Sequence, residues 1–176
     1  KHIMPENKLV PVPDGVSDEV ASCVTLKGIT AEYLLHRAYT LKKGDKVLYH
    51  AAAGALGQIL CPWANSIGAE IIGTVGSKEK EEIAKKNGCH HVINYTDKDF
   101  VEEVEKIVGK NGIDVVYDGV GLKTFEGSIE VLKIRGMMVA FGNASGYVDT
   151  IDVKKHINAK GLFFTRPSIA HYTIER

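Results

Sequence analysis

The feature that most constrains the fold is an alternation of short apolar runs with helix-like stretches, which begins at Gly44 and continues almost to the end of the chain. Runs typical of buried strands fall at residues 46–50, 70–75, 91–95, 113–117, 136–141 and 161–165. Helices are expected from Gly57 to about Ser66, after the N-cap residues Ser77 and Thr96, and over residues 124–132. Near-continuous apolar strands that alternate with helices indicate a parallel sheet covered on both faces. We therefore predict an α/β fold, a doubly wound six-stranded parallel sheet of the Rossmann type with strand order 3-2-1-4-5-6.

A glycine-rich loop follows the first predicted strand. It reads Ala52-Ala53-Gly54-Ala55-Leu56-Gly57, which is the G-x-G-x-x-G pattern with alanine in the first place. In such a loop Gly54 lets the backbone approach a pyrophosphate, and Gly57 lets the helix pack closely on the strand. The following helix presents free N–H groups and its positive dipole end to phosphate. The position of the motif between strand and helix predicts a dinucleotide site, against the alternative of a tight turn without a ligand.

The end of the second predicted strand indicates which dinucleotide is bound. An NAD site usually has Asp or Glu about 20 residues after the loop, where it binds the ribose hydroxyls. This chain instead reads Gly76-Ser77-Lys78-Glu79-Lys80. A small residue, a hydroxyl and two cations suit a 2′-phosphate, so the sequence predicts NADPH rather than NADH, and it disfavours a methyltransferase-type domain. The alternative is that Ser77 only caps a helix and that the lysines are solvated.

Six short motifs occur in a fixed order along nearly the whole chain. They are Lys27-Gly28-Ile29-Thr30-Ala31, the segment from His50 to Gly57, Ile93-Asn94-Tyr95, Asp118-Gly119-Val120-Gly121, the segment from Phe141 to Gly146, and Thr165-Arg166-Pro167-Ser168. In this order they resemble the cofactor domain of zeta-crystallin-like NADPH:quinone oxidoreductases, the zinc-independent quinone reductases of the medium-chain dehydrogenase/reductase superfamily. The resemblance implies hydride or electron transfer from NADPH to a quinone. An enone or aldehyde reductase of the same superfamily and a non-catalytic NADPH-binding structural or interaction module are the alternatives.

The resemblance also implies where the parts of NADPH lie. The 2′-phosphate is expected at Lys80 and Tyr95, with Gly76 and Ser77 beside them, and the pyrophosphate at the loop of Ala52, Ala53, Gly54, Ala55, Leu56 and Gly57. The adenine–ribose side is expected near Val120, and the nicotinamide end near Thr30, Phe141, Gly142 and Asn143. Each assignment outside the loop has an ordinary alternative: Tyr95 as a strand-end aromatic, Phe141 as core, Asn143 as a left-handed turn residue, and Thr30 as a helix residue bonding its own backbone.

Residues 1–43 differ in character from the rest. Three prolines predict an extended segment over residues 1–16, Ser17 is expected to cap a short helix, and a buried helix is expected over about 25–40, interrupted near Gly28. The resemblance implies that residues 1–43 are a linker and helices leading from a GroES-like catalytic domain that this chain lacks, and that residues 44–176 are the NADP-binding domain. We therefore expect the chain to bind NADPH without turning over quinones, and we assign no catalytic residue.

The composition and the predicted sheet edge bear on partners and location. The chain has 22 Lys and Arg against 22 Asp and Glu, which argues against a basic nucleic-acid-binding face. No run approaches the roughly 20 apolar residues of a membrane span, and no secretory leader is visible, so a cytoplasmic protein without a membrane partner is expected. The apolar sixth strand at a sheet edge predicts a homodimer through that edge, against the alternative that residues 1–16 cover it.

Four remaining features are interpreted as structural. Cys23, Cys61 and Cys89 form no CxxC pair and are expected to be reduced thiols, with Cys23 in the core and no metal site. The pair His90-His91 is expected at the surface. Pro62 falls inside the helix after the glycine loop, where a kink near Gln58 or an early break is expected. Ala55 adds a methyl group where a phosphate approaches.

Overall fold

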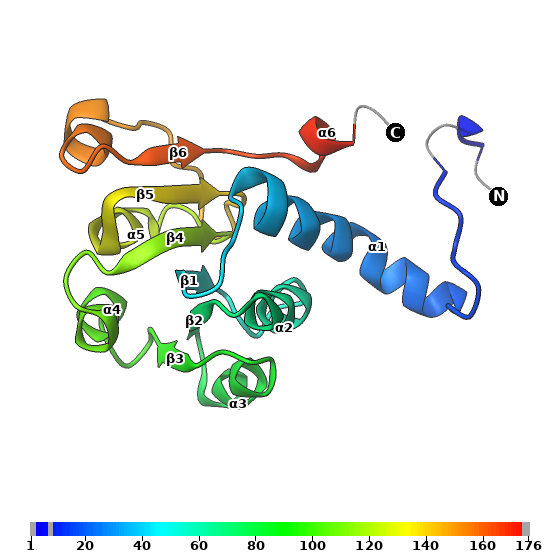
Figure 1. Ribbon diagram of the computed structural model, residues 1–176, viewed down its shortest axis with the longest axis horizontal. Helices are drawn as coiled ribbons and strands as arrows, with labels where there is room; N and C mark the ends of the chain where they lie inside the picture. The colour runs from blue at the N-terminus through cyan, green and yellow to red at the C-terminus, as the bar shows by residue number, and fades with distance from the viewer. Residues whose placement is uncertain (1–2, 7–8, 174–176) are drawn as a thin grey trace.

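The computed structural model of the chain describes residues 3–6 and 9–173, and its centre is a single parallel sheet (Figure 1). The sheet has six strands, in the order β3-β2-β1-β4-β5-β6, so the predicted fold and strand order are confirmed. The strands are β1 (Lys46–His50), β2 (Glu70–Val75), β3 (His91–Asn94), β4 (Ile113–Asp118), β5 (Leu132–Ala140) and β6 (Phe163–Thr165). All five neighbouring pairs are parallel. Every strand therefore ends at the same edge of the sheet.

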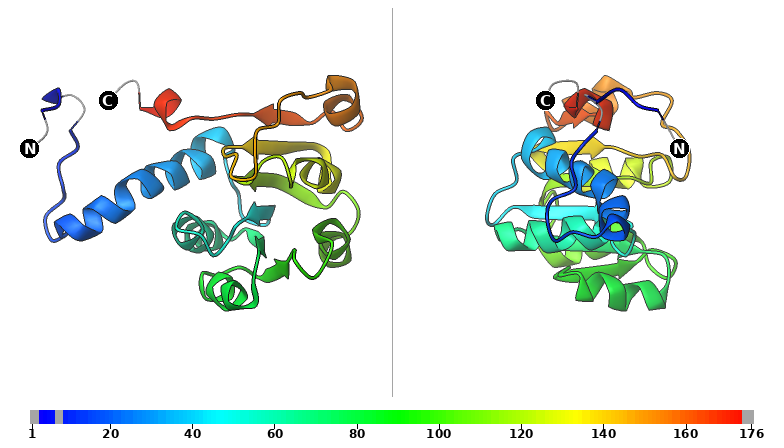
Figure 2. Two further views of the ribbon diagram at one scale, coloured as in Figure 1. Left: turned by 180° about the vertical axis from the view of Figure 1, so that it is seen from behind. Right: turned by 90° about the vertical axis from the view of Figure 1, so that its right-hand side faces the viewer.

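Helices cover both faces of the sheet (Figures 1 and 2). On one face, the buried side chains of Val47, Ile71 and Val115 form a core with α1 (Asp18–Tyr33), η2 (Leu34–Ala38), α2 (Gly57–Ile67) and α3 (Lys78–Lys86). The next residue of each strand, as at Leu48 and Ile72, points to the other face. There it packs against α4 (Phe100–Val108), α5 (Phe125–Val131) and the π-helix η3 (Val153–Asn158). A short helix, α6 (Ile169–Tyr172), lies near the chain end and stacks Tyr172 on Tyr33 at 4.4 Å.

The N-terminal helix differs from its prediction. Ser17 caps it, as expected, but α1 then runs without interruption through Gly28 and continues into η2. An interior glycine costs a helix only about 1 kcal/mol, which is too little to break one whose end is anchored by the fully buried Leu34 and Leu35. The described residues before Ser17 have no strand, although residues 14 and 15 form a turn; the prediction for residues 1–2 and 7–8 lies outside the described residues.

The first half of α1 extends beyond the sheet (Figure 1), which explains a second wrong prediction. Cys23 is exposed rather than in the core, because no other element covers this part of the helix. Cys61 and Cys89 are buried, and all three thiols are free. Residues 9–16 lie beyond the outer end of α1, away from β6, so the expected alternative cover of the β6 edge by this segment is wrong (Figures 1 and 2).

Two further boundaries were wrong for local reasons. The helix α4 is capped by Asp99, whose carboxylate accepts the N–H groups of Val101 and Glu102 at 2.8 and 3.3 Å, and not by Thr96, whose hydroxyl donates to Asn94 at 2.7 Å. The helix α2 continues unbroken through Pro62, so the expected early break is absent from this part of the structure. Pro62 is exposed, where water can bond the carbonyl that a proline leaves free.

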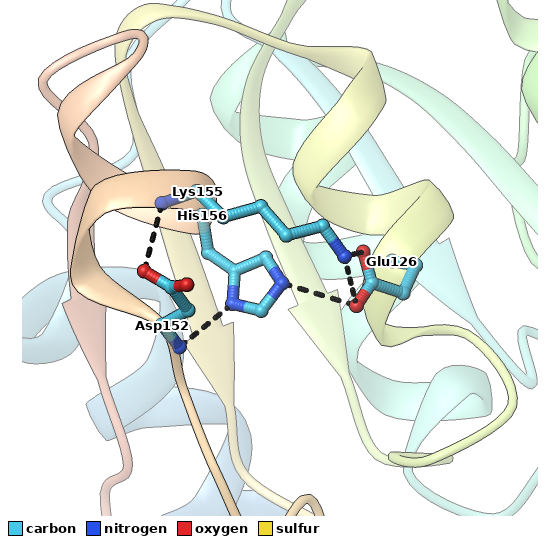
Figure 3. Close-up of polar contacts among 4 residues, drawn as sticks. All are labelled: Glu126, Asp152, Lys155 and His156. Atoms are coloured by element: carbon cyan, nitrogen blue, oxygen red, sulfur yellow. Dashed lines mark hydrogen bonds and ion pairs between the residues drawn. The ribbon is translucent and has the colours of Figure 1, made fainter.

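Polar contacts tie η3 to α5 at the far face of the sheet (Figure 3). The carboxylate of Glu126 on α5 accepts from Lys155 Nζ at 2.9 Å and faces His156 Nε2 at 3.0 Å. His156 Nδ1 accepts the backbone N–H of Asp152 at 3.1 Å, and Asp152 in turn caps η3. Lys160 donates to three carbonyls at the end of α5, which fixes the connection that leads into β6.

Candidate cofactor-binding site

The glycine loop occupies the sheet edge between β1 and α2 and is wound too tightly for side chains. A Cβ on Gly57 would lie 2.2 Å from the carbonyl oxygen of Ala52, and one on Gly54 would lie 3.0 Å from that of Ala51. Ala51 itself has a φ of 61°, a left-handed conformation that non-glycine residues rarely adopt. The N–H of Gly54 bonds the Ala51 carbonyl at 2.9 Å and the N–H of Ala52 bonds the Thr74 carbonyl at 3.0 Å, so both sides of Ala51 are held.

The start of α2 offers unpaired donors beside this loop. In the described part of the chain, the backbone N–H groups of Ala55, Leu56 and Gly57 make no hydrogen bond to another protein group. The first N–H groups of a helix have no partner within the helix, and together with the helix dipole they bind anions well. The loop and the helix start thus fit a pyrophosphate, as the sequence predicts.

A second group of predicted residues meets at the end of β2. A Cβ on Gly76 would lie only 2.6 Å from the hydroxyl oxygen of Tyr95, so this hydroxyl rests directly on the glycine backbone. Ser77 caps α3, with its Oγ accepting the N–H of Lys80 at 3.4 Å. Tyr95 is 46% exposed, which argues against a purely structural role, and Lys80 is exposed with no ion pair among the described residues. A hydroxyl, a helix start and an exposed cation therefore lie near the end of β2.

Glu79 is the one acidic group in this cluster. A hydrogen bond with Ser77 lowers its pKa below the usual value, so the carboxylate is charged at neutral pH. Its side chain is fully exposed and follows the helix cap, whereas the end of β2, where an NAD site would carry an acid, is Gly76. The cluster fits a 2′-phosphate better than a pair of ribose hydroxyls.

The loops after β4 and β5 pack together as one unit. The N–H of Phe141 bonds the carbonyl of Asp118 at 2.9 Å, and the N–H of Ser145 bonds that of Val120 at 2.8 Å. A Cβ on Gly142 would lie 2.4 Å from the carbonyl oxygen of Gly119. The structure thereby gathers Val120, Phe141, Gly142 and Asn143 at the same sheet edge as the glycine loop.

An open cleft of about 660 Å³ lies between α1 and residues 166–171, and from the loop unit Phe141 lines it. Thr30, Leu56, Phe141 and Arg166 are among the residues that line it. The Thr30 hydroxyl donates to the Leu26 carbonyl at 2.7 Å, which is the ordinary alternative considered from the sequence, although the residue also faces the cleft.

The purely structural alternatives for Phe141 and Asn143 are not supported. Phe141 is only half-buried and stacks on Tyr49 with a centroid distance of 6.4 Å, so it is not simple core. Asn143 has no positive φ, so its interpretation as a left-handed turn residue is wrong. It lines a second cavity of about 190 Å³ together with Asp118 and Arg166.

Several residues at this edge had been passed over or were not given a role. Arg166 lines both cavities and donates to the Ala140 carbonyl at 2.9 Å. Four buried polar residues on four elements also lie beneath the loops: His50, Thr74, Asp118 and Ser128. Only Asp118 and His50 stood in recognised motifs, and no spacing in the sequence links the four.

The described residues contain neither a group of metal-ligating side chains nor a membrane-spanning helix. No three His, Cys, Asp or Glu side chains between residues 3–6 and 9–173 are grouped so that they could hold a metal ion. Within the same ranges, no helix combines the length and the apolar character that crossing a membrane requires.

Comparison with known proteins places this geometry in a family context. The family model described as zinc-binding dehydrogenase matches residues 55–175. The chain is 48% identical to a 2-haloacrylate reductase of a Burkholderia species over 179 aligned residues, covering 100% of this chain and 54% of that protein. It is 43% identical to quinone oxidoreductase 1 of Escherichia coli over 176 residues, covering 99% of this chain and 54% of that protein.

A solved structure gives the same result. The crystal structure of Escherichia coli quinone oxidoreductase complexed with NADPH superposes with a TM-score of 0.90 at 44% identity, covering 94% of this chain and 51% of that one. The chain thus spans about half the length of the relatives it matches. The resemblance to quinone oxidoreductases drawn from the ordered motifs is confirmed.

Proposed function

Because this chain belongs to the zinc-binding dehydrogenase family, we propose that it binds NADPH at the carboxyl edge of its sheet and forms the cofactor-binding part of a quinone oxidoreductase. The proposal draws support from relatives named quinone oxidoreductase and from the NADPH complex of one of them. It draws independent support from the geometry of the edge, where the unpaired N–H groups at the start of α2 and the Tyr95 hydroxyl beside Gly76 can donate to phosphate.

The observation that carries the proposal is the contact between Tyr95 and Gly76. It brings a hydroxyl to the start of α3, next to Ser77 and the unpaired Lys80, at the point where a 2′-phosphate distinguishes NADPH from NADH. The glycine loop, with the free N–H groups of Ala55 and Leu56, would hold the pyrophosphate. The rest of the dinucleotide would then run along the edge toward Val120 and the cleft beside Phe141 and Thr30.

Bound NADPH would supply the hydride, and the chain would supply binding, orientation and exclusion of water. Leu56 and Phe141 give the cleft an apolar wall, and Thr30 and Arg166 add polar groups at its rim. We assign no catalytic residue to this chain.

We further propose that turnover needs a domain corresponding to the half of the relatives that this chain does not match. Residues 1–43 would lead from that domain, and residues 44–176 would form the NADP-binding domain. Leu34 and Leu35 are fully buried against the sheet, so the end of the leading segment is docked on the binding domain. The exposed apolar side chains of Val20, Val24 and Leu26 on α1 are available to such a domain.

Binding and turnover by the 176-residue chain test this proposal together. We expect NADPH to bind measurably, with a Kd at least tenfold lower than that of NADH, and no quinone-dependent oxidation of NADPH above background. The variant Lys80→Ala should narrow the difference between the two dinucleotides. Equal affinity for both would overturn the cofactor assignment, and robust quinone reduction by the isolated chain would overturn the need for a further domain.

A second candidate is reduction of an activated carbon–carbon double bond. It is favoured by the 48% identity to a 2-haloacrylate reductase, which is higher than the 43% identity to quinone oxidoreductase 1. Parallel assays of a protein carrying both halves, with quinones and with 2-haloacrylates, decide between the two substrates. A non-catalytic NADPH-binding module is supported if neither substrate is reduced.

The assembly and location are proposed on separate grounds. Among the described residues β6 pairs only with β5, and Phe163 on it is 51% exposed, so we propose that a second copy of the chain pairs along this edge. Light scattering at micromolar concentration should give a dimer, and a monomer would contradict the pairing. The three free thiols support a reducing, cytoplasmic location, which cell fractionation tests.

A further inference from the structure

Three neighbouring strands end in a row of buried polar residues on one face of the sheet. His50 is paired with Thr74 in the β1–β2 register, and the pairing of Tyr49 with Tyr117 places Asp118 beside His50 on the other side. Two residues earlier along each strand, apolar side chains such as Leu48 lie on the same face. His50, Thr74 and Asp118 are each at most 1% exposed. The apolar core of this face thus ends in a polar layer directly beneath the three loops of the candidate site.

The hydrogen bonds of this layer point toward one carboxylate, that of Asp118. Asp118 Oδ2 lies 2.8 Å from Thr124 Oγ1 and 3.4 Å from the hydroxyl of Ser128 on α5. A carboxylate can only accept, so the Ser128 proton points to Asp118. Ser128 Oγ is then left to accept from His50 Nε2, 3.0 Å away. The Nε2 atom of His50 must therefore carry the proton.

The other nitrogen of the imidazole completes this row of hydrogen bonds. His50 Nδ1 lies 2.9 Å from Thr74 Oγ1 and, without a proton, accepts from that hydroxyl. The ring is neutral in this arrangement, and the ring of Phe100 closes over it edge-on at 5.1 Å. Burial lowers the pKa of His50, in agreement with the neutral form, while the nearby charge of Asp118 opposes this effect only in part.

The two residues at the ends of this hydrogen-bonded row, Thr74 and Asp118, both contact loops of the candidate site. Thr74 also accepts the N–H of Ala52 through its carbonyl at 3.0 Å, which holds the glycine loop. Asp118 Oδ1 accepts the N–H groups of Val120 and Gly121 at 2.7 and 2.9 Å, and its carbonyl accepts that of Phe141. The imidazole is the link between these two groups of contacts.

We propose that His50 is a positioning residue: as a neutral imidazole protonated on Nε2, it fixes the glycine loop against the loops after β4 and β5 and so sets the distance between the two ends of the NADPH site. The inference rests on the proposed function for its role in binding, but not for the state of the ring. Because both NADPH and NADH span these loops, loss of the link weakens both dinucleotides equally.

The state of the ring is tested first on the unaltered chain without a ligand. Long-range proton–nitrogen NMR spectra of the ¹⁵N-labelled protein should show His50 with Nε2 protonated and Nδ1 unprotonated from pH 8 to pH 5.5. A ring protonated on Nδ1, or one that titrates near pH 6.5, would overturn the inference whatever the chain binds.

The role in positioning is tested by three variants, each titrated with NADPH and NADH and checked for folding by circular dichroism. His50→Leu removes both hydrogen bonds of the imidazole and should weaken both dinucleotides by about tenfold. His50→Gln keeps a donor toward Ser128 and should recover part of the loss. Ser128→Ala breaks the same link from α5, so it serves if His50→Leu does not fold.

The matched control is His156→Gln. His156 is also buried and makes two hydrogen bonds, to Glu126 and Asp152, but these contacts join η3 to α5 and involve no residue of the candidate site (Figure 3). This variant should lose stability with unchanged affinity. If the His50 and Ser128 variants behave in the same way, the role of His50 is only structural and the inference fails. If the unaltered chain binds neither dinucleotide, the proposed function fails instead, while the NMR result still decides the state of the ring.

Discussion

A methyl group at Gly76 is predicted to weaken NADPH binding while leaving the fold intact. The added Cβ would lie 2.6 Å from the hydroxyl oxygen of Tyr95 and 3.0 Å from its Cζ atom, so the ring has to move. It can do so because Tyr95 is 46% exposed. The loss in free energy of unfolding should therefore stay below ~1 kcal/mol, as for most substitutions near the surface.

The displaced hydroxyl is the group assigned to the 2′-phosphate. A hydrogen bond to a charged group contributes about 1.5–3 kcal/mol, and each 1.4 kcal/mol changes Kd tenfold, so Gly76→Ala should weaken NADPH binding roughly 10- to 150-fold. NADH has no such phosphate, and its Kd should change less than about twofold. Fluorescence titration of both dinucleotides measures the effect.

The matched control for this experiment is Gly28→Ala, because a Cβ at Gly28 meets no atom within 4 Å. It should leave both affinities unchanged. An equal loss for NADPH and NADH in Gly76→Ala, or no loss for NADPH, would refute the placement of the 2′-phosphate against Tyr95.

Three further predictions concern stability. Gly28→Ala should raise the free energy of unfolding by about 0.5–1 kcal/mol, since it removes a glycine from the interior of an unbroken helix; an unchanged or lower Tm would contradict this. Lys160→Met should lower it by about 1–3 kcal/mol by leaving three carbonyls at the end of α5 without their donor, and urea titration measures the loss. Burial lowers the pKa of His50 below the ordinary histidine value of 6.5 in the folded chain, so the unfolded chain takes up a proton first as the pH falls. Stability should therefore decline below about pH 6.5, by at most ~1.4 kcal/mol per pH unit, and His50→Gln should show no such decline between pH 6.5 and 5.

The sheet could be predicted in detail because its strands carry their own signal. Residues 46–50 and 70–75 are near-continuous apolar runs bounded by glycine or charged residues, and the structure gives these two strands with the predicted bounds. Ser77 was predictable as a helix cap for the same local reason. By contrast, Thr96 and Asp99 are both acceptable caps by residue type. Only the bond from Thr96 to Asn94 decides between them.

The long-range part of the candidate site could not be predicted in this way. Tyr95 reaches Gly76 because β2 and β3 are paired in a register that aligns Val75 with Asn94, and no pattern along the chain reports that register. The resemblance to a known family gave both residues a role but no contact. His50 lay within a recognised motif, yet its partners come from three other elements, so its place in a polar layer emerged only from the fold.

Exposure was the other property that the sequence did not reveal. Cys23 has no His or Glu partner at the spacing of a metal site and was therefore expected in the core, yet it lies with Val20 and Val24 in the first half of α1. These side chains are exposed because α1 continues past the sheet (Figure 1). Apolar residues occur both in the part of α1 that packs on the sheet and in the part that extends beyond it. The elements that pack against a helix therefore have to be known before the burial of its residues can be assigned.

The most direct test of NADPH binding at this sheet edge is an amide NMR titration of the chain with NADPH and NADH in parallel. Both dinucleotides are predicted to shift the N–H signals of Ala55 and Leu56 at the glycine loop. Only NADPH is predicted to shift those of Gly76 and Ser77 strongly. Shifts of Gly76 and Ser77 that are the same with both dinucleotides, or shifts that miss the glycine loop, would contradict the account.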